Sequence, residues 1–197
     1  MGKGAVGKTS LILRFVTNKC PKEHDPTVED SYNVSFKSKT GEEKEFQILD
    51  TAGEEDYQNM QDNWINSSKG FILVFAINDL ESFQHLRNIV TRIKKNEAEN
   101  KPHIVIGNKR DLEQKREVTT QQVEEFCKTI NAKYFEVSAL KDNNENVKVA
   151  FQECANMIMD KLSGNNDGNK GCCCFIFWLT IIFNTQQYFY KIIIYVF

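Results

Sequence analysis

The sequence predicts an α/β fold in which helices cover both faces of a mostly parallel sheet. Apolar runs alternate with amphipathic stretches from residue 1 to about residue 163, which is the pattern of repeated strand–helix units. One run, Gly70–Ile77, is apolar throughout, as expected of a strand that is buried on both faces. Ligands of such sheets bind at the carboxyl ends of the strands, so motifs that directly follow strands are the candidate functional residues.

The first expected elements are a helix over Lys8–Asn18 and a hairpin. The hairpin strands, Tyr32–Lys39 and Lys44–Leu49, alternate apolar and polar residues on either side of the turn Thr40-Gly41-Glu42. Strands and amphipathic helices then follow one another. The expected strands are Gly70–Ile77, Ile104–Ile106 and Tyr134–Val137, and the expected helices are Glu81–Asn96, Thr120–Ile130 and Glu145–Leu162.

Length and composition fit one globular domain with a tail. The chain has 197 residues, a net charge of −2, 26% charged and 41% hydrophobic residues. This near-neutral balance gives no electrostatic support for nucleic acid as a partner. The cysteines form neither a disulfide framework nor a CxxC metal pair, which favours a reducing, cytosolic setting. We expect a domain over residues 1–163, a flexible polar linker over 164–171 and a cysteine-rich, apolar tail over 172–197.

A phosphate-binding loop is predicted at the start of the chain, where the sequence matches the pattern GxxxxGK[ST]. The matching residues are Gly2, Lys3, Gly4, Ala5, Val6, Gly7, Lys8 and Thr9, and Ser10 follows them. Glycines let backbone N–H groups converge on phosphate oxygens, and the next helix points its positive end at the same anion. Lys8 would reach the β- and γ-phosphates, and the Thr9 hydroxyl would ligate Mg²⁺. The alternative is an ordinary glycine-rich turn before a helix.

An aspartate ends the second strand of the expected hairpin. In the motif Asp50-Thr51-Ala52-Gly53, the position of Asp50 opposite a phosphate-binding loop suits a water-mediated contact with Mg²⁺. Gly53 would let a backbone N–H approach the γ-phosphate. Taken alone, the motif would more often be a turn that ends a strand.

A further motif predicts selection of guanine. Asn108, Lys109 and Asp111 follow the strand Ile104–Ile106. The Asp111 carboxylate only accepts hydrogen bonds, so it suits the N1–H and N2–H₂ edge of guanine, which adenine lacks. Lys109 would cover one face of the base and Asn108 would tie the base-binding loops together. After the next strand come Ser138 and Ala139, where the Ala139 N–H would meet guanine O6. An NKxD motif alone is weak, and its value here comes from its order behind the two motifs above.

Together these motifs resemble the Ras superfamily of small GTPases, over residues 2 to about 162. The resemblance implies a P-loop NTPase fold with a six-stranded sheet, and a GDP/GTP switch with Mg²⁺ as cofactor. It also implies Thr27 as an Mg²⁺ ligand, residues Gly53 to about Asp62 as a second switch segment, and hydrolysis at Lys8, Gly53 and residue 54. The implied partners are exchange factors, GTPase-activating proteins and effectors. The segment that resembles the effector loop of the Ras and Rap branch is His24, Asp25, Pro26, Thr27, Val28, Glu29, Asp30, Ser31 and Tyr32.

Four substitutions depart from the family pattern. Glu54 stands where the family usually has the glutamine that orients the attacking water, and a carboxylate adds negative charge and lacks the amide donor, so slow hydrolysis is expected. Cys20 replaces a phenylalanine that borders the guanine, which should loosen the nucleotide. His24 replaces a tyrosine, and Leu140 replaces a lysine whose place over the base its apolar body could still take. The alternative function is a non-hydrolysing, GTP-bound module that docks effectors.

The strand that precedes the phosphate-binding loop in the family has no counterpart before Met1. We expect five strands, two unpaired edges in the middle of the sheet, and an incomplete gene model or fragment as the cause.

The tail contains a candidate lipidation segment, Cys172, Cys173 and Cys174. Cys174–Phe177 would be a prenylation motif if the chain ended there, and a second lipid at the other cysteines would stabilise an anchor. The chain as written continues past this motif, which excludes prenylation of this form. The extension resembles translated noncoding sequence, and Asn184–Gln187 interrupts it as a membrane span. We expect lipid anchoring of a differently ended chain at the cytoplasmic face of the plasma membrane.

Overall fold

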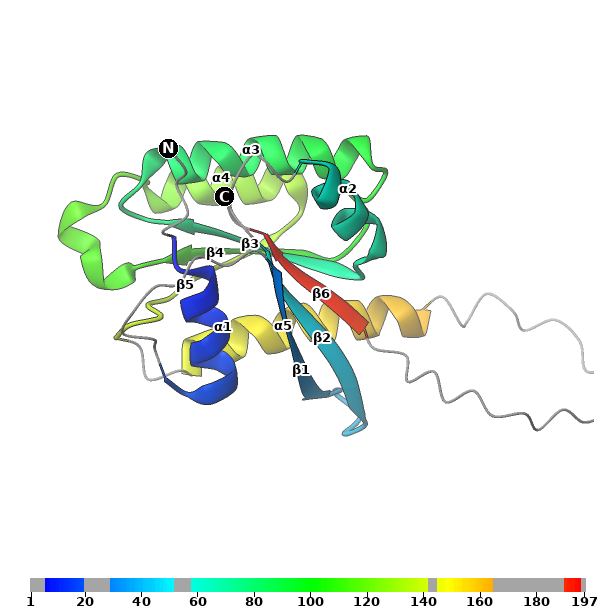
Figure 1. The fold of residues 1–197 in the computed structure, drawn as a ribbon. Coiled ribbons are helices and arrows are strands. Elements are labelled where there is room, and N and C mark those ends of the chain that lie inside the picture. Colours follow the sequence, from blue (N-terminus) through cyan, green and yellow to red (C-terminus); the bar gives the residue numbers. More distant parts are fainter. Residues whose placement is uncertain (1–5, 20–28, 52–57, 142–144, 165–189, 196–197) are drawn as a thin grey trace, which may run out of the picture.

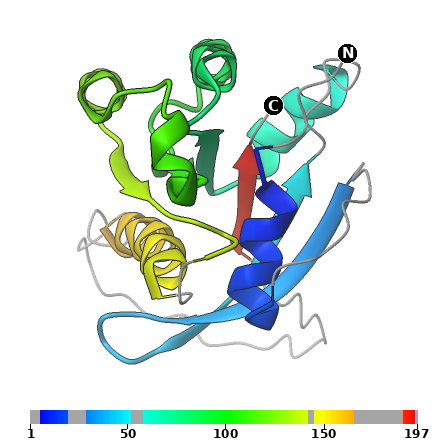
Figure 2. The same cartoon turned by 90° about the vertical axis from the view of Figure 1, so that its left-hand side faces the viewer.

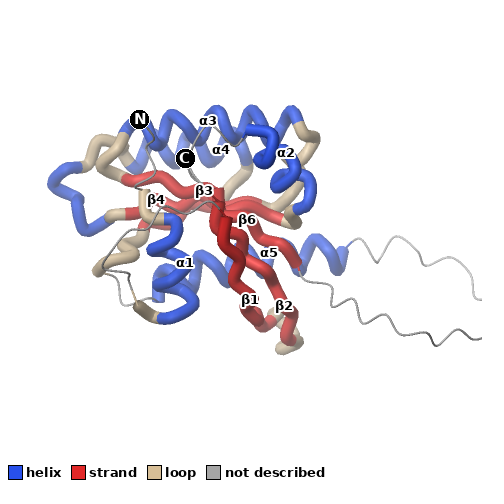
Figure 3. The backbone as a smooth tube through the Cα atoms, in the orientation of Figure 1, coloured by secondary structure: helices blue, strands red, loops and turns tan. Residues whose placement is uncertain are grey.

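The computed structural model describes residues 6–19, 29–51, 58–141, 145–164 and 190–195. These residues form one six-stranded sheet with a layer of helices on each face (Figures 1 and 3). The strands are β1 (Glu29–Lys37), β2 (Glu43–Thr51), β3 (Gly70–Ala76), β4 (His103–Asn108), β5 (Lys133–Glu136) and β6 (Tyr190–Tyr195). The helices are α1 (Lys8–Thr17), α2 (Gln58–Ser67), α3 (Leu80–Lys95), α4 (Thr120–Ile130), α5 (Glu145–Gly164) and the 3₁₀ helix η2 (Arg110–Lys115).

The strand order is β1-β2-β6-β3-β4-β5. β1 and β2 form an antiparallel hairpin, and the other neighbouring pairs are parallel. The predicted fold class, α/β with a mostly parallel sheet, is therefore confirmed. The carboxyl ends of β2, β3 and β4 consequently lie along one edge of the sheet, the edge at which α1 begins (Figure 1).

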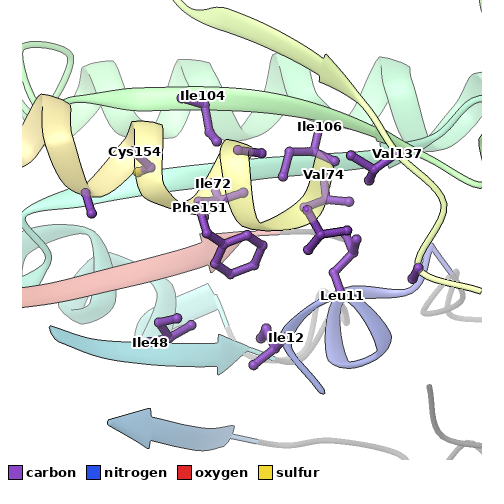
Figure 4. Close-up of a cluster of buried hydrophobic side chains, with 14 of the residues drawn as sticks. Leu11, Ile12, Ile48, Ile72, Val74, Ile104, Ile106, Val137, Phe151 and Cys154 are labelled. Carbon is purple, nitrogen blue, oxygen red and sulfur yellow. The ribbon is translucent and has the colours of Figure 1, made fainter. Parts of the chain in front are cut away.

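The core has two parts because the central strands are buried on both faces. On one face, β3 residues such as Ile72 pack with α1 and α5 residues such as Leu11 and Phe151 (Figure 4). On the other face, β3 residues such as Phe71 and Leu73 pack under α2, α3 and α4. Alternate residues of a strand point to opposite faces, so a strand covered by helices on both sides must be apolar throughout, as β3 is.

A strand from the far end of the chain lies between β2 and β3. β6 pairs in parallel with Phe46–Asp50 of β2 and with Gly70–Leu73 of β3 (Figure 2). The expectation of five strands with two unpaired edges at this place is therefore wrong. That expectation sought the central strand immediately before the phosphate-binding loop, whereas the β-branched run Ile192–Ile194, which suits a buried parallel strand, lies in the tail.

The remaining differences are small. The hairpin strands β1 and β2 begin before the predicted residues, and β4 is longer at both ends than predicted. α2 and η2 were not predicted as helices. No helix among the described residues is long and apolar enough to cross a membrane.

Candidate nucleotide-binding site

The amino terminus of α1 begins the candidate site. Gly7 caps the helix in the left-handed region with φ 87°, and its carbonyl accepts from the Leu11 N–H at 2.9 Å. A Cβ atom at Gly7 would lie 2.6 Å from the side-chain amide nitrogen of Asn108. Both the backbone angle and the close approach therefore require glycine here.

Lys8 and Thr9, the next two residues, face the end of β2. The Thr9 hydroxyl donates to Asp50 Oδ2 at 2.6 Å, and Asp50 is fully buried. Lys8 is only 6% exposed. Burial disfavours its charged form and lowers the pKa of Lys8 to about 8, while the Asp50 carboxylate acts in the opposite direction. Two motifs that are separated by 41 residues thus meet at one point.

Asn108, at the end of β4, holds two loops together. Its amide donates to the Val6 carbonyl at 2.7 Å, and its side-chain oxygen accepts from the Ala139 N–H at 3.1 Å. The Asn108 side chain is buried, so water does not compete for these hydrogen bonds. The phosphate-binding segment and the loop after β5 are therefore joined through one side chain.

Asp111 lies beside the same loop. Ser138 donates its hydroxyl to Asp111 Oδ1 at 2.6 Å and accepts from the Lys141 N–H at 2.9 Å. Lys109, between the two motif residues, has φ 65°, and burial lowers its pKa, with Asp79 and Asp111 acting in the opposite direction. The arrangement gives a carboxylate and a half-buried lysine on the loop that follows β4.

A group of residues that the sequence reasoning missed supports this region. The Arg116 guanidinium contacts Glu136 at 2.9 Å and Glu113 at 2.6 Å, and the Tyr134 hydroxyl also donates to Glu136. Burial alone would raise the pKa of Glu136. Hydrogen bonds from Arg116 and Tyr134 together lower it by more, so the pKa of Glu136 lies below its usual value. No sequence motif pairs Arg116 with Glu113 or Glu136, because arginine and glutamate are common on protein surfaces.

Several predicted site residues lie outside the described residues. They are Gly2, Lys3, Gly4, Ala5, His24, Asp25, Pro26, Thr27, Val28, Gly53, Glu54, Cys20, Cys172, Cys173 and Cys174. The described part of the expected effector segment belongs to β1, the edge strand, where Asp30 and Ser31 are exposed. Ser10 lies in the first turn of α1, and Leu140 is 62% exposed.

The fold and these contacts define an α/β protein in which the start of α1 meets the ends of β2 and β4 at the carboxyl edge of the sheet. The family model described as "Ras family" matches residues 1–160. Ras-like protein rasS from Dictyostelium discoideum is 35% identical over 171 residues, which cover 86% of this chain and 87% of that protein. The chain therefore belongs to the Ras family of small GTPases, whose members bind and hydrolyse GTP as switches.

Proposed function

We propose that this chain binds GDP and GTP with Mg²⁺, hydrolyses GTP slowly, and acts as a signalling switch on effector proteins. The observation that carries the proposal is the contact of Thr9 with Asp50 beside the buried Lys8. Burial makes the charged form of this lysine costly, and a polyphosphate bound at this point would add its negative charge to that of the Asp50 carboxylate and so stabilise the ammonium group.

The oxygens at this point suit Mg²⁺. Thr9 offers a hydroxyl and Asp50 a carboxylate, and hard oxygen ligands are what Mg²⁺ prefers. Among the residues that the structure describes, no group of three His, Cys, Asp or Glu side chains gathers as a metal cage. We propose that Thr9, Asp50 and Thr27 hold an Mg²⁺ ion that keeps several waters and takes phosphate oxygens as its other ligands. Such an ion would neutralise charge that develops on the phosphates.

The base would lie on the loops after β4 and β5. Asp111 would accept from guanine N1–H and N2–H₂, and the Ala139 N–H would face guanine O6. Ser138 orients the Asp111 carboxylate, because its hydroxyl donates to Oδ1. Asn108 joins these loops to the phosphate-binding segment, so it supports the relative position of both halves of the site.

Hydrolysis should be slow because of Glu54. A carboxylate near the γ-phosphate adds like charge and lacks the amide N–H₂ that would orient water.

The effector segment ends on the exposed edge strand β1, which supports docking of partner proteins there. We also propose that lipid at Cys172–Cys174 holds a differently ended form at the cytoplasmic face of the plasma membrane.

The experiment is single-turnover hydrolysis of GTP by the full chain, with and without Mg²⁺. Glu54→Gln should raise the rate, most clearly with a GTPase-activating protein, while the neighbouring Glu55→Gln serves as the matched control. A lower rate for Glu54→Gln would show that the carboxylate acts as a base. If neither the unaltered chain nor Glu54→Gln hydrolyses GTP while both still bind it, the non-hydrolysing effector-docking module is favoured.

A further inference from the structure

We propose that the gap between β2 and β3 is a strand-binding site for the chain's own segment Tyr190–Tyr195, and that its occupation supports nucleotide binding. The proposal rests on the nucleotide-binding function proposed above. It adds that the phosphate side of the site is positioned by the last strand of the sequence.

The backbone of the two flanking strands requires an occupant. β2 is paired with β1 on its other side, and β3 with β4, so the facing backbone groups of Phe46–Asp50 and Gly70–Leu73 depend on β6. These stretches are buried apart from Gln47, which is half-buried. Buried backbone N–H and C=O groups are nearly always paired, and an open sheet interior would violate this.

The residues of β6 match the register positions that they occupy. Ile193 is level with Leu49 and Phe71, which belong to the core under α2, α3 and α4. Ile192 and Ile194 are level with Ile48 and Ile72, respectively, in the opposite core. The three isoleucines therefore stand where the strand is flanked on both sides.

The single charged residue of β6 also stands at a suitable position. Lys191 pairs with Gln47 of β2. The first residue of β6 that pairs with β3 is the next one, Ile192, which lies opposite Gly70. A lysine is thus placed at the entrance of the gap and not in its middle, where an unpaired charge would be costly.

The docked strand also contacts the backbone of the candidate site. Ile194 is the register partner of Asp50, the residue that accepts the Thr9 hydroxyl. Because β6 runs parallel to β2 and β3, its carboxyl end reaches the edge at which the site lies. Binding of the strand and binding of nucleotide should therefore favour each other, since a coupling between two sites is reciprocal.

The chain's own tail can reach the gap. Residues 165–189 connect α5 to β6, and a chain of this length can extend over roughly 80 Å. The occupant is thus a segment of this chain, and a strand donated by a second copy is the competing outcome that the experiment must detect.

Cysteine pairs in the full chain test occupation of the gap. Gln47→Cys with Lys191→Cys places thiols on register partners, and neighbouring strands lie about 4.8 Å apart, within disulfide range. Gln47→Cys with Ile192→Cys is the matched control, because consecutive residues point to opposite faces. Each single variant controls for the native cysteines. We expect oxidation to join only the first pair, within one chain. Equal joining of both pairs, no joining, or a joined dimer would overturn the assignment.

A milder variant tests the coupling to nucleotide. Ile193→Ala should speed release of a fluorescent GDP analogue about three- to ten-fold and raise hydrogen exchange in Phe46–Asp50. Ile182→Ala, the same change in the tail outside β6, should alter neither. An unchanged release rate and exchange in Ile193→Ala would refute the coupling. If the unaltered chain binds no guanine nucleotide, the proposed function fails, but the cross-linking and exchange results still decide whether β6 occupies the gap.

Discussion

Replacing Asn108 with alanine should separate the two halves of the site. The variant removes an amide that donates to the Val6 carbonyl at 2.7 Å and an oxygen that accepts from the Ala139 N–H at 3.1 Å. Both partners belong to buried residues, at 1% and 5% exposure. The backbone groups left behind would therefore have poor access to water.

The size of the effect follows from these two unpaired groups. A buried donor or acceptor that loses its partner costs about 1–3 kcal/mol, so the two together should cost about 2–6 kcal/mol. This is a large part of the roughly 5–15 kcal/mol that stabilises an ordinary domain. Because 1.4 kcal/mol is about a factor of ten, nucleotide release should speed up by at least about five-fold if half of the cost falls on the bound state.

Asn96→Ala provides the matched control. The Asn96 amide also makes two hydrogen bonds, to Asp62 Oδ1 and to the Arg92 carbonyl, both at 3.0 Å. This side chain is partly exposed at the end of α3, so water can replace it, and a cost below about 1.5 kcal/mol is expected. Urea unfolding in excess GDP and release of a fluorescent GDP analogue measure both effects. Equal losses in the two variants would refute the role of Asn108 as a tie between loops.

Three further predictions concern the base, the nucleotide lifetime and pH. Asp111→Asn should reduce GTP affinity at least about ten-fold and raise affinity for xanthosine triphosphate, because asparagine donates where guanine also donates; a competition titration measures this. Cys20→Phe should slow GDP release about five-fold by adding an aromatic contact of about 1 kcal/mol. Bound phosphates should raise the pKa of Lys8 above its value of about 8 in the free protein, so binding takes up a proton. Affinity should then fall above pH 8 by up to about ten-fold per pH unit, and Lys8→Arg should abolish this slope in a binding titration, because arginine stays charged.

The sequence predicted those elements whose local signals agree with their final environment. α4 has the predicted bounds, Thr120–Ile130, because Thr119 and Gln122 form a capping box and its apolar residues recur at helical spacing. β3 was predicted because burial on both faces demands a continuous apolar run. Motif order predicted that Thr9 and Asp50 lie opposite each other at the carboxyl edge of the sheet, and the direct hydrogen bond between them was not predicted.

What could not be predicted depends on long-range pairing. Nothing local distinguishes Ile192–Ile194 as a central strand, because an apolar tail also suits a membrane or an unfolded extension. Strand order is decided by which backbone edges remain unpaired after the other strands have formed, and this is a property of the whole sheet. The contacts of Arg116 with Glu113 and Glu136 were missed for a similar reason, since they join a loop to β5 without any motif.

The strand order also explains why β6 affects a site to which it contributes no motif. Asp50 ends β2 and Asn108 ends β4, with β6 and β3 between them. If β6 left and β2 paired directly with β3, Asp50 would move toward Asn108 by one strand spacing, about 4.8 Å. The Thr9 hydroxyl donates to Asp50 at 2.6 Å, and Asn108 donates to the carbonyl of Val6, three residues before Thr9. A hydrogen bond tolerates a change of only a few tenths of an ångström in its donor–acceptor distance. Both contacts therefore hold together only while one strand fills the gap, so the separation between the phosphate and base halves of the site is set by residues at the opposite end of the sequence.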